Sequence, residues 1–526
     1  MSSFLSKLLN HYSLSLEDLE ARKALRSFAS LTTPFELEDF KGVVKRLKQA
    51  VLNKEKTVIY GDYDVDGLTS TTIIYLALKE LGLPVGYFIP SRFHEGYGLN
   101  EKRVEEFAKK GYHLIVTVDN GITAFSSIAL AKKLGMETVV IDHHELTSTL
   151  PDTPYVFHQF KSGFLKYNCS AASLSYFVAR SLLNRDDEYL ATLAGIAVFS
   201  DVMPLVGNNL VFARLALSFL NKNRYPNLVS LIGNKESYDY EDFSFSLIPA
   251  LNSPGRVSKE VMATNNTAKF LMERNNDTVI KKYASEIASL NQQRKDIVKN
   301  ISFDPSKYLS SDHGEVLYTS QYGGLSGLFA NKAMREKKVP VAVFSLDDTD
   351  PENLVGSLRA PDPYRVDVFL SQNPQLFISC GGHSKAAGLK IKKKDYFKVA
   401  TAFLSECEKQ SLENNQVSEE HISLDLEDLN EDNYRTLEEF MPFGEGFEAP
   451  LFSLSLGREN LVFSQNGNAA FSYSPDKKSK LFFYGDIKPL KDEHYSYYVF
   501  VGQFRKETFQ GKVSYSLFST NFDSQI

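Results

Sequence analysis

Strands and helices alternate between residues 57 and about 205 of this 526-residue chain, and this alternation constrains the fold more than any other feature. Helical segments, the clearest of which are 71–81, 102–109 and SSIALAKKLG, separate the apolar runs TVIY, VGYFIP, HLIVTVD and ETVVIDHH. Because strands that are apolar throughout must be covered on both faces, the pattern predicts an α/β domain built on a parallel sheet.

Carboxylates follow three of these predicted strands. The aspartates are Asp62, Asp64 and Asp66 after the first strand, Asp119 after the third and Asp142 after the fourth. In parallel α/β sheets, ligands bind beyond the carboxyl ends of the strands. The sequence therefore predicts an acidic functional site at this edge of the sheet.

The chain is too long for one hydrophobic core, so we expect several domains. Residues 1–50 predict a helical lead-in, and residues 51–256 predict the parallel-sheet domain. Few glycines or prolines occur in residues 257–302, which favours a long connecting helix.

The second half of the chain predicts three more parts. Residues 303–406 contain the strands EVLY, VPVAVF and AGLKI around the helix GLFANKAMREKK, which predicts a smaller α/β domain. Residues 407–449 form an acidic linker. Short aromatic-rich strands in residues 450–526 favour a small OB-like β-barrel, in which most aromatic residues must belong to the core.

Cysteine usage and apolar content indicate the compartment. The three cysteines, Cys169, Cys380 and Cys407, are widely spaced and form no CxxC pair, so we expect neither a disulfide framework nor a thiolate zinc site. The sequence has no signal-peptide pattern at its start and no run of about 18 apolar residues. We therefore expect a cytoplasmic protein that does not enter the membrane.

The net charge of −6 by itself disfavours nucleic acid as a partner, because affinity for phosphate comes from lysine and arginine. However, residues 406–439 alone hold twelve acids against two bases, which exceeds the whole net negative charge. A basic groove elsewhere is therefore compatible with the composition.

The motif GDYDVDG at residues 61–67 also matches the beginning of an EF-hand calcium loop. In that loop the twelfth position is a glutamate that binds calcium through both oxygens, but here it is Ile73, and a strand rather than a helix precedes the motif. A calcium loop is therefore disfavoured, and a solvated acidic turn is the simpler alternative.

Three further motifs favour a metal site over these two alternatives. VDNG at 118–121, IDHH at 141–144 and FSDVMPL at 199–205 each add a carboxylate, and one adds His143 and His144, which in isolation would be ordinary surface histidines. Carboxylates with one imidazole per ion favour Mn²⁺ or Mg²⁺ over zinc. Two such ions about 3.5–4 Å apart can activate a water and stabilise a leaving oxygen, which predicts phosphoester hydrolysis.

The ordered set GDYDVDG, VDNG, DHH and SDVMPL resembles the four motifs of the DHH phosphoesterase superfamily, and GDYDxDG is similar to its RecJ branch. The segments LNSPGR, GSLR, GGHSKAAGL and PFGEGF also resemble that branch. The resemblance covers residues 50–450. It implies a DHH catalytic domain, a long helix, a DHH-associated domain that binds substrate and an OB-like barrel that binds nucleic acid.

The resemblance also implies a ligand set for two Mn²⁺ or Mg²⁺ ions. Asp64 and Asp66 would bind different ions, Asp119 would bridge them, and His143 with Asp201 would complete the second site.

Three further residues are implied to act beside the ions. Asp62 and Asp142 would orient the ligands, and His144 would face the scissile phosphate. Some family members have a histidine ligand where this chain has Tyr60. The first ion would therefore have fewer protein ligands here.

A cleft that holds the terminal phosphate is implied next to the ions. Arginine suits this role because its guanidinium can donate two hydrogen bonds, although an ordinary surface ion pair is the alternative for Arg92. The candidates are Arg92, Arg256, Ser357, Arg359 and His383.

The resemblance implies a single-stranded-DNA-specific 5′–3′ exonuclease that releases 5′-mononucleotides in DNA repair and recombination. Single-stranded DNA would be its substrate, a single-strand-binding protein or a helicase its partner, and the monomer its state. The alternatives are a DHH phosphodiesterase acting on short RNA oligonucleotides and a non-enzymatic scaffold, which the intact set of aspartates and histidines disfavours.

Overall fold

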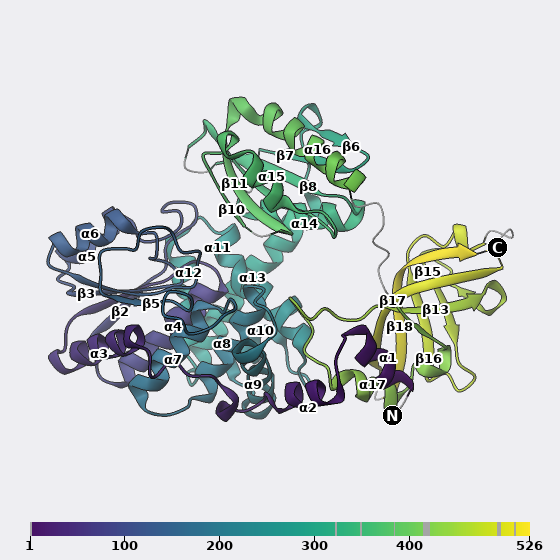
Figure 1. Cartoon of the computed structure of the whole chain (residues 1–526), viewed down its shortest axis with the longest axis horizontal. Helices are drawn as coiled ribbons and strands as arrows, with labels where there is room; N and C mark the ends of the chain where they lie inside the picture. The colour runs from purple at the N-terminus through teal and green to yellow at the C-terminus, as the bar shows by residue number, and fades with distance from the viewer. Residues whose placement is uncertain are drawn as a thin grey trace. The chain divides into compact units, whose positions relative to one another are not determined.

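The computed structural model describes residues 3–320, 323–347, 350–382, 384–413, 421–491, 496–509 and 512–525. The chain divides into two compact units (Figure 1). The large unit consists of residues 33–203 and 215–417, and the small unit of residues 1–32, 204–214 and 418–526. The finer division into six parts stays a prediction.

A five-stranded parallel sheet organises the first half of the large unit, in the order β2-β1-β3-β4-β5. This confirms the predicted fold class, and adds β5 at the edge next to β4. The strands are β1 (Thr57–Tyr60), β2 (Val85–Phe88), β3 (Leu114–Val118), β4 (Glu137–Ile141) and β5 (Tyr155–Phe157).

The helices around this sheet bury apolar faces against it. They are α3 (Glu38–Asn53), α4 (Val65–Glu80), α5 (Glu101–Lys109), α6 (Phe125–Lys133), α7 (Ala171–Leu183) and α8 (Glu188–Ser200). The sequence predicts a helix only from residue 71, but α4 begins inside the acidic motif. The reason is that Asp64 is the N-cap and its side chain accepts a hydrogen bond from the Gly67 amide at 3.1 Å.

The connecting region contains α10 (Pro226–Ile232), a π-helical turn (Asp242–Leu247), α11 (Ile248–Val257), α12 (Val261–Met272) and the 24-residue α13 (Asp277–Asn300). The predicted long helix is present as α13, but α12 is separate from it. Glu273 separates them because its carboxylate accepts hydrogen bonds from the amides of residues 274–276. Asn276 then caps α13.

A second α/β region follows in the large unit. Its six-stranded sheet has the order β10-β11-β9-β8-β7-β6 and is mixed, because only β7 and β8 pair in parallel. The elements are β6 (Leu309–Ser311), β7 (Gly314–Thr319), α14 (Ser326–Lys337), β8 (Val341–Leu346), β9 (Asn353–Arg359), α15 (Val366–Gln372), β10 (Ser379–Gly382), β11 (Ala386–Lys392) and α16 (Tyr396–Glu413).

The small unit contains the predicted all-β region as one seven-stranded sheet, in the order β12-β13-β17-β18-β16-β15-β14. Among the described residues, no pairing between β12 and β14 closes it into a barrel. The strands are β12 (Ile422–Leu424), β13 (Phe452–Gly457), β14 (Val462–Phe463), β15 (Ala469–Tyr473), β16 (Ser479–Tyr484), β17 (Tyr497–Phe509) and β18 (Lys512–Gln525).

One face of this sheet carries the core of the small unit. The helices α1 (Ser3–His11), α2 (Leu16–Ala24), α9 (Gly207–Asn223) and α17 (Glu431–Glu438) belong to it wholly or in part. Phe4 of α1 stacks on Phe452 with ring centroids 5.9 Å apart, and both rings are buried with Phe500 and Phe504. The aromatic residues of alternating strand positions are thus largely core, as the sequence predicts.

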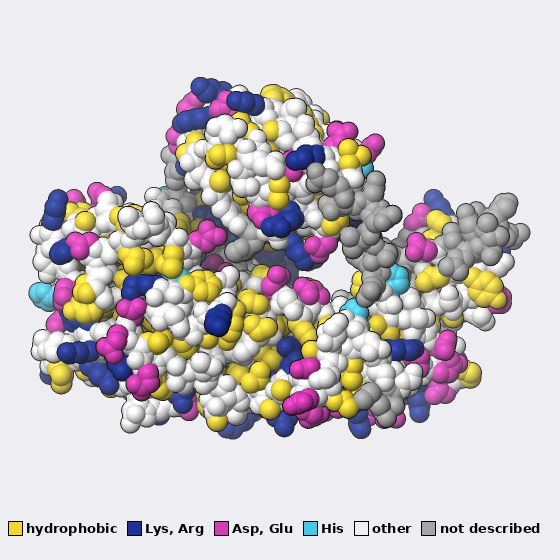
Figure 2. Space-filling model, viewed as in Figure 1, with side chains coloured by type: hydrophobic (Ala, Val, Ile, Leu, Met, Phe, Trp, Pro, Cys, Tyr) yellow, Lys and Arg dark blue, Asp and Glu magenta, His cyan; other side chains and the backbone are white. Residues whose placement is uncertain are grey.

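Basic and acidic side chains are interspersed over the visible face of the molecule (Figure 2). Within the described residues, no helix has both the length and the apolar character needed to cross a membrane.

Candidate metal centre

The structure brings five carboxylates and two imidazoles together at the carboxyl ends of the parallel strands. They form three overlapping groups in which the potential ligand atoms lie within 4.8 Å of one another. The groups are Asp62, Asp64 and Asp119; Asp66, His143 and Asp201; and Asp119, His143 and His144.

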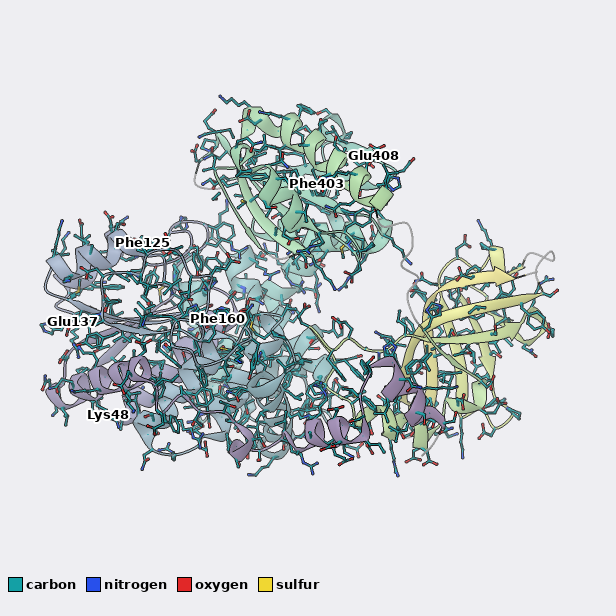
Figure 3. The ribbon with its side chains drawn as sticks, viewed as in Figure 1. Lys48, Phe125, Glu137, Phe160, Phe403 and Glu408 are labelled. Atoms are coloured by element: carbon teal, nitrogen blue, oxygen red, sulfur yellow. The ribbon has the colours of Figure 1, made fainter. Side chains whose placement is uncertain are left out.

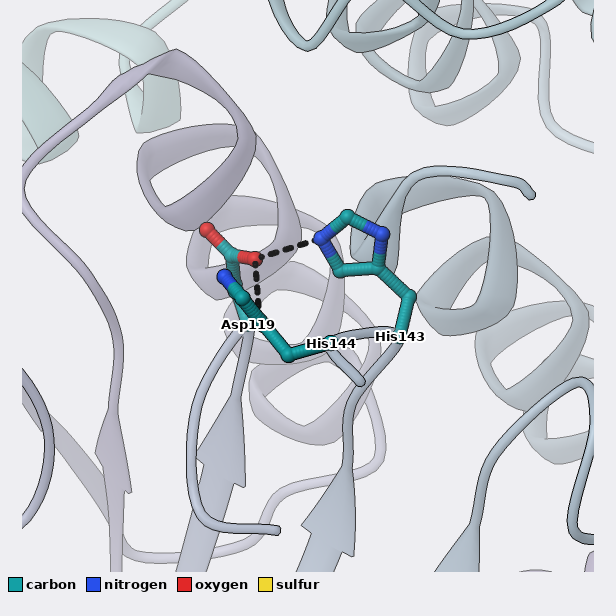
Figure 4. A group of neighbouring side chains, drawn as sticks. All are labelled: Asp119, His143 and His144. Carbon is teal, nitrogen blue, oxygen red and sulfur yellow. Dashed lines mark ion pairs between the residues drawn. The ribbon is translucent and has the colours of Figure 1, made fainter. Parts of the chain in front are cut away.

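His143 lies at the middle of this cluster. Its Nε2 atom is 3.2 Å from Asp119 Oδ1, 3.4 Å from Asp201 Oδ2 and 3.7 Å from Asp66 Oδ2. Figure 4 shows its contact with Asp119. The ring also hydrogen-bonds to the backbone of Cys169, which orients the imidazole and leaves Nε2 directed at the three acids.

Helix ends hold two of the carboxylates. Asp66 lies in the first turn of α4 and accepts hydrogen bonds from the amides of Ala171 at 2.7 Å and Ala172 at 2.8 Å. These amides open α7, so the positive end of that helix dipole favours the ionised carboxylate. Asp201 is the C-cap of α8.

Asp119 directly follows β3 and has a left-handed backbone with φ 60°. Its carbonyl oxygen accepts a hydrogen bond from the Tyr97 hydroxyl at 3.2 Å. The same hydroxyl is 3.1 Å from Nδ1 of His144. Tyr97 therefore connects the ends of β3 and β4 at the centre.

Asp142 is completely buried and holds the segment that follows β4. It accepts hydrogen bonds from the amides of Ile122 at 2.9 Å and His143 at 2.7 Å, and from Nδ1 of His144 at 2.8 Å. The side chain of His144 is 42% exposed. Asp142 thus orients His144 without leaving the core.

The carboxylates of the cluster repel one another in a buried setting. Burial and then the charge of Asp64 raise the pKa of Asp66 to about 7 and the pKa of Asp62 well above its usual value. Burial and then the charge of Asp66 raise the pKa of Asp119 and Asp201 well above the usual value. Added positive charge, such as a bound cation, would therefore stabilise the ionised carboxylates of the cluster.

Asp142 and the two histidines behave differently. Burial alone would raise the pKa of Asp142, but the hydrogen bond and charge of His144 outweigh burial and lower the pKa. Burial and then the nearby charge of His144 lower the pKa of His143 to about 3. Burial alone would also lower the pKa of His144, but its hydrogen bond to Asp142 outweighs this and raises the pKa to about 9.

The donor set fits Mn²⁺ or Mg²⁺. It consists of carboxylate oxygens with a neutral imidazole nitrogen, and no cysteine sulfur takes part among the described residues, which suits hard divalent cations. Asp62 Oδ1 is buried and has no hydrogen-bond partner in the described chain. A buried oxygen without a donor is what a cation or its water would satisfy.

Tyr60 supplies no ligand. Its side chain is buried, its hydroxyl donates to the Gly98 carbonyl at 3.0 Å, and its ring stacks on Phe88. The position that carries a histidine ligand in some family members therefore serves the core here.

Four of the five phosphate candidates are described, whereas His383 lies outside the described residues. Nη1 of Arg92 donates to the Gly324 carbonyl at 3.2 Å, and Nη1 of Arg359 donates to Ser357 Oγ at 2.9 Å. Burial and then the charge of Arg92 lower the pKa of Arg256 to about 10. Within the described part of the chain, no carboxylate lies within 4.0 Å of Arg92, Arg256 or Arg359.

Sequence reasoning misses four residues around these sites. Tyr97, His158 and Gln159 contact residues 142–144, which we call the DHH segment. Arg294 of α13 adds positive charge near Arg256. His158 and Gln159 follow an apolar strand, YVF, so the signal that identifies Asp119 and Asp142 could have found them. Nothing in the local sequence distinguishes Tyr97 or Arg294.

Comparisons with known proteins agree with this geometry. Residues 56–198 match the family model described as the DHH family, N-terminal domain. The chain is 28% identical over 429 residues to the single-stranded-DNA-specific exonuclease RecJ of Bacillus subtilis, covering 79% of this chain and 54% of that protein. It is 27% identical over 471 residues to RecJ of Haemophilus influenzae, covering 81% and 79%. The chain thus spans about half the length of the Bacillus relative.

Solved structures show the same fold. RecJ of Thermus thermophilus in complex with Mn²⁺ matches with a TM-score of 0.77 at 20% identity, covering 98% of this chain and 78% of that chain. An exonuclease RecJ bound to manganese matches with a TM-score of 0.57 at 23% identity, covering 71% and 95%. Residues 56–198 are thus similar to the DHH family, and the chain as a whole is similar in sequence and in fold to RecJ exonucleases.

Proposed function

We propose that this protein is a metal-dependent exonuclease that degrades single-stranded DNA from the 5′ end and releases 5′-mononucleotides. The observation that carries the proposal is the convergence of five carboxylates and two imidazoles at one edge of the parallel sheet. Supporting it, several relatives are named single-stranded-DNA-specific exonucleases.

Five residues would hold two Mn²⁺ or Mg²⁺ ions. Asp64 and Asp66 would each hold an ion, Asp119 would be shared by the two sites, and His143 with Asp201 would complete the second site. When bound, the ions supply Lewis-acid activation of water and neutralise charge on the phosphodiester. The overlap of the three groups at Asp119 and His143 supports this assignment.

Asp142, His144 and Asp62 act beside the ions. Asp142 accepts a hydrogen bond from Nδ1 of His144 and orients the ring, whose exposed part would face the scissile phosphate. Asp62, which is buried next to Asp64, would orient the ligands around it.

The arginine cluster would bind the terminal 5′-phosphate. Its described members are Arg92, Arg256 and Arg359 with Ser357, and the predicted fifth residue, His383, lies outside the described residues. None of the three guanidinium groups has a carboxylate within 4.0 Å in the described chain, which leaves their N–H groups available to a phosphate. A phosphate held there, one nucleotide from the ions, would make cleavage proceed from the 5′ end.

The sheet of the small unit would grip the single strand through three phenyl rings that we call the phenylalanine row, namely Phe471, Phe482 and Phe518. They lie directly opposite one another on β15, β16 and β18, on the face away from the core. The rings of Phe471 and Phe482 stack at 5.1 Å, and the Arg505 guanidinium lies 4.3 Å over Phe518. Aromatic faces with a nearby arginine stack nucleobases of any sequence.

The remaining assignments are the finer ones. We propose that the protein acts as a monomer in DNA repair and recombination, with a single-strand-binding protein or a helicase as its partner. Its three cysteines are all unpaired, which supports a reducing cytoplasm as its location.

The decisive experiment is a Mn²⁺-dependent digestion of matched substrates. Single-stranded DNA with a 5′-phosphate should release mononucleotides whether or not its 3′ end is blocked, whereas a duplex should resist and EDTA should stop the reaction. Asp64→Ala and His143→Ala should lose turnover and keep DNA binding.

Two results would favour the alternatives. Hydrolysis confined to di- to tetranucleotides, with RNA preferred, would indicate an oligoribonuclease. If no mononucleotides are released and Asp142→Ala changes nothing, the scaffold alternative becomes the better explanation.

A further inference from the structure

Two buried polar residues follow β5, the edge strand beside the one that precedes the DHH segment. Both His158 and Gln159 have no exposed surface. The pairing of β4 with β5 ends at Ile141 and Phe157, and the Asp142 amide donates to the Phe157 carbonyl at 3.2 Å. The chain after β5 therefore continues alongside residues 142–144.

His158 has a defined tautomer in this position. Its Nδ1 accepts hydrogen bonds from the amides of Phe160 at 3.2 Å and Lys161 at 3.4 Å. Because Nδ1 is an acceptor, the proton of the neutral ring is on Nε2, which lies 2.7 Å from the His144 carbonyl oxygen and donates to it. Phe160, labelled in Figure 3, is 43% exposed at the surface end of this turn.

Gln159 makes the corresponding contact with the neighbouring residue. Its Nε2 donates to the His143 carbonyl oxygen at 3.1 Å. Two consecutive carbonyl groups of the DHH segment are thus held by two consecutive side chains. With both carbonyls held, the peptide plane between His143 and His144 cannot turn without breaking a buried hydrogen bond.

We infer that His158 and Gln159 are positioning residues for the metal centre. They hold the backbone from which the His143 ring reaches Asp66, Asp119 and Asp201, and from which the His144 ring reaches Asp142. The inference rests on the proposed function, because it takes His143 to be a metal ligand. Removal of a group that orients a metal ligand typically weakens metal affinity by about 10–100-fold.

The state of Gln159 argues against a role in packing alone. Its Oε1 is buried without a hydrogen-bond partner among the described residues. An unsatisfied buried carbonyl costs about 1–3 kcal/mol, so an apolar side chain of the same size would suit a purely structural position better. The Gln159 amide is present despite this cost, and its Nε2 atom is the one that holds the His143 carbonyl.

The test at position 158 compares two variants with the same functional group. In His158→Gln the amide reaches as far as Nε2 and can donate to the His144 carbonyl, whereas in His158→Asn it is one methylene too short. We expect His158→Gln to bind Mn²⁺ within about threefold of the unmodified protein, and His158→Asn to bind it about 10-fold or more weakly. Mn²⁺ binding to the full chain is measured by electron paramagnetic resonance.

The second test removes the donor at position 159. Gln159→Met keeps the length of the side chain and leaves every backbone hydrogen bond of the turn in place, so it serves even if His158→Asn does not fold. We expect weaker Mn²⁺ binding, a lower kcat and an unchanged KM for 5′-phosphorylated single-stranded DNA.

The outcomes separate the inference from the proposed function. If the unmodified protein binds Mn²⁺ and degrades DNA while Gln159→Met and a folded His158→Asn match it in both measurements, only the positioning role is wrong. If the unmodified protein itself neither binds Mn²⁺ nor releases mononucleotides, the proposed function fails.

Discussion

Two residues of the metal centre have a left-handed backbone although neither is glycine. Asp119, the proposed bridging ligand, has φ 60°, and Val202, which follows Asp201, has φ 52°. A β-branched side chain is rare in this region because its Cβ crowds the backbone. The turn after α8 therefore stores strain next to a proposed ligand.

Relief of this strain gives a prediction about stability. Val202 is 61% exposed, so Val202→Asn removes little burial and places a residue that tolerates the left-handed region. We expect the free energy of unfolding of the large unit to rise by about 1 kcal/mol. In calorimetry, the unfolding transition of the large unit is the one whose temperature rises when Mn²⁺ is added.

Leu150→Asn is the control in the same unit, because Leu150 is 43% exposed and is not among the residues with positive φ. An equal gain from both substitutions would mean that the gain does not come from the turn at Val202.

At the residue scale, the sequence identifies the charged side chains of the metal centre but not the residues that position them. Asp119 and Asp142 could be found because a carboxylate directly follows an apolar strand. Tyr97 could not, because its role depends on a hydroxyl that meets residues 22 and 47 positions away. Such contacts depend on how the loops pack rather than on any local pattern.

At the scale of elements, the start of α4 determines the shape of the acidic loop. A Cβ at Gly67 would lie 2.6 Å from the carbonyl carbon of Asp62, so only glycine allows the loop to fold back over the first turn. The helix and the loop that precedes it are thus one structural piece.

Gly67→Ala tests this arrangement. We expect a loss of stability of about 1–3 kcal/mol and weaker Mn²⁺ binding, because the loop at residues 62–66 must shift. Hydrogen exchange of residues 61–67 would locate the change. In the control Gly42→Ala, a Cβ meets nothing within 4 Å in α3, so we expect unchanged Mn²⁺ binding and equal or higher stability.

The phenylalanine row gives a second prediction at this scale. Phe482→Ala removes the ring that lies between Phe471 and Phe518, and we expect it to weaken binding of long single-stranded DNA by about 1–3 kcal/mol. Fluorescence anisotropy with labelled oligonucleotides measures the change. Phe397→Ala, at a 54% exposed phenylalanine of α16, serves as the control. If the two variants bind single-stranded DNA with equal affinity, the phenylalanine row is not part of the DNA-binding site.

Element boundaries depend on side chains that the periodicity of apolar residues does not reveal. The parallel sheet could be predicted because its strands are apolar throughout and its helices are amphipathic. The break between α12 and α13 could not, because it results from one carboxylate that binds three successive amides. The strand β5 was missed because it has only three residues.

At the scale of the whole molecule, the chain brings distant segments into one core. Phe4, Leu8 and Leu9 of α1 are buried with strand residues beyond position 450, although the sequence alone predicts only a helical lead-in for that region. A core assembled from segments so far apart leaves no local signal in either segment.

This arrangement predicts that a substitution near the start of the chain destabilises the small unit. Phe4→Ala removes a ring that packs on Phe452 and Phe504, and we expect a loss of about 3–5 kcal/mol. Calorimetry would show it in the transition that Mn²⁺ does not shift. Leu16→Ala, at a residue that is 44% exposed, should have little effect.

The same arrangement has a consequence during synthesis on the ribosome. Helix α1 is made before the strands that bury it, because Phe500, Phe504 and Leu517, which complete its core, follow about 500 residues later. At about 5–20 residues per second, the wait is roughly 25–100 s. The apolar side of the nascent helix has no native partner in that time, so we expect it to be held by a chaperone until the last strands arrive.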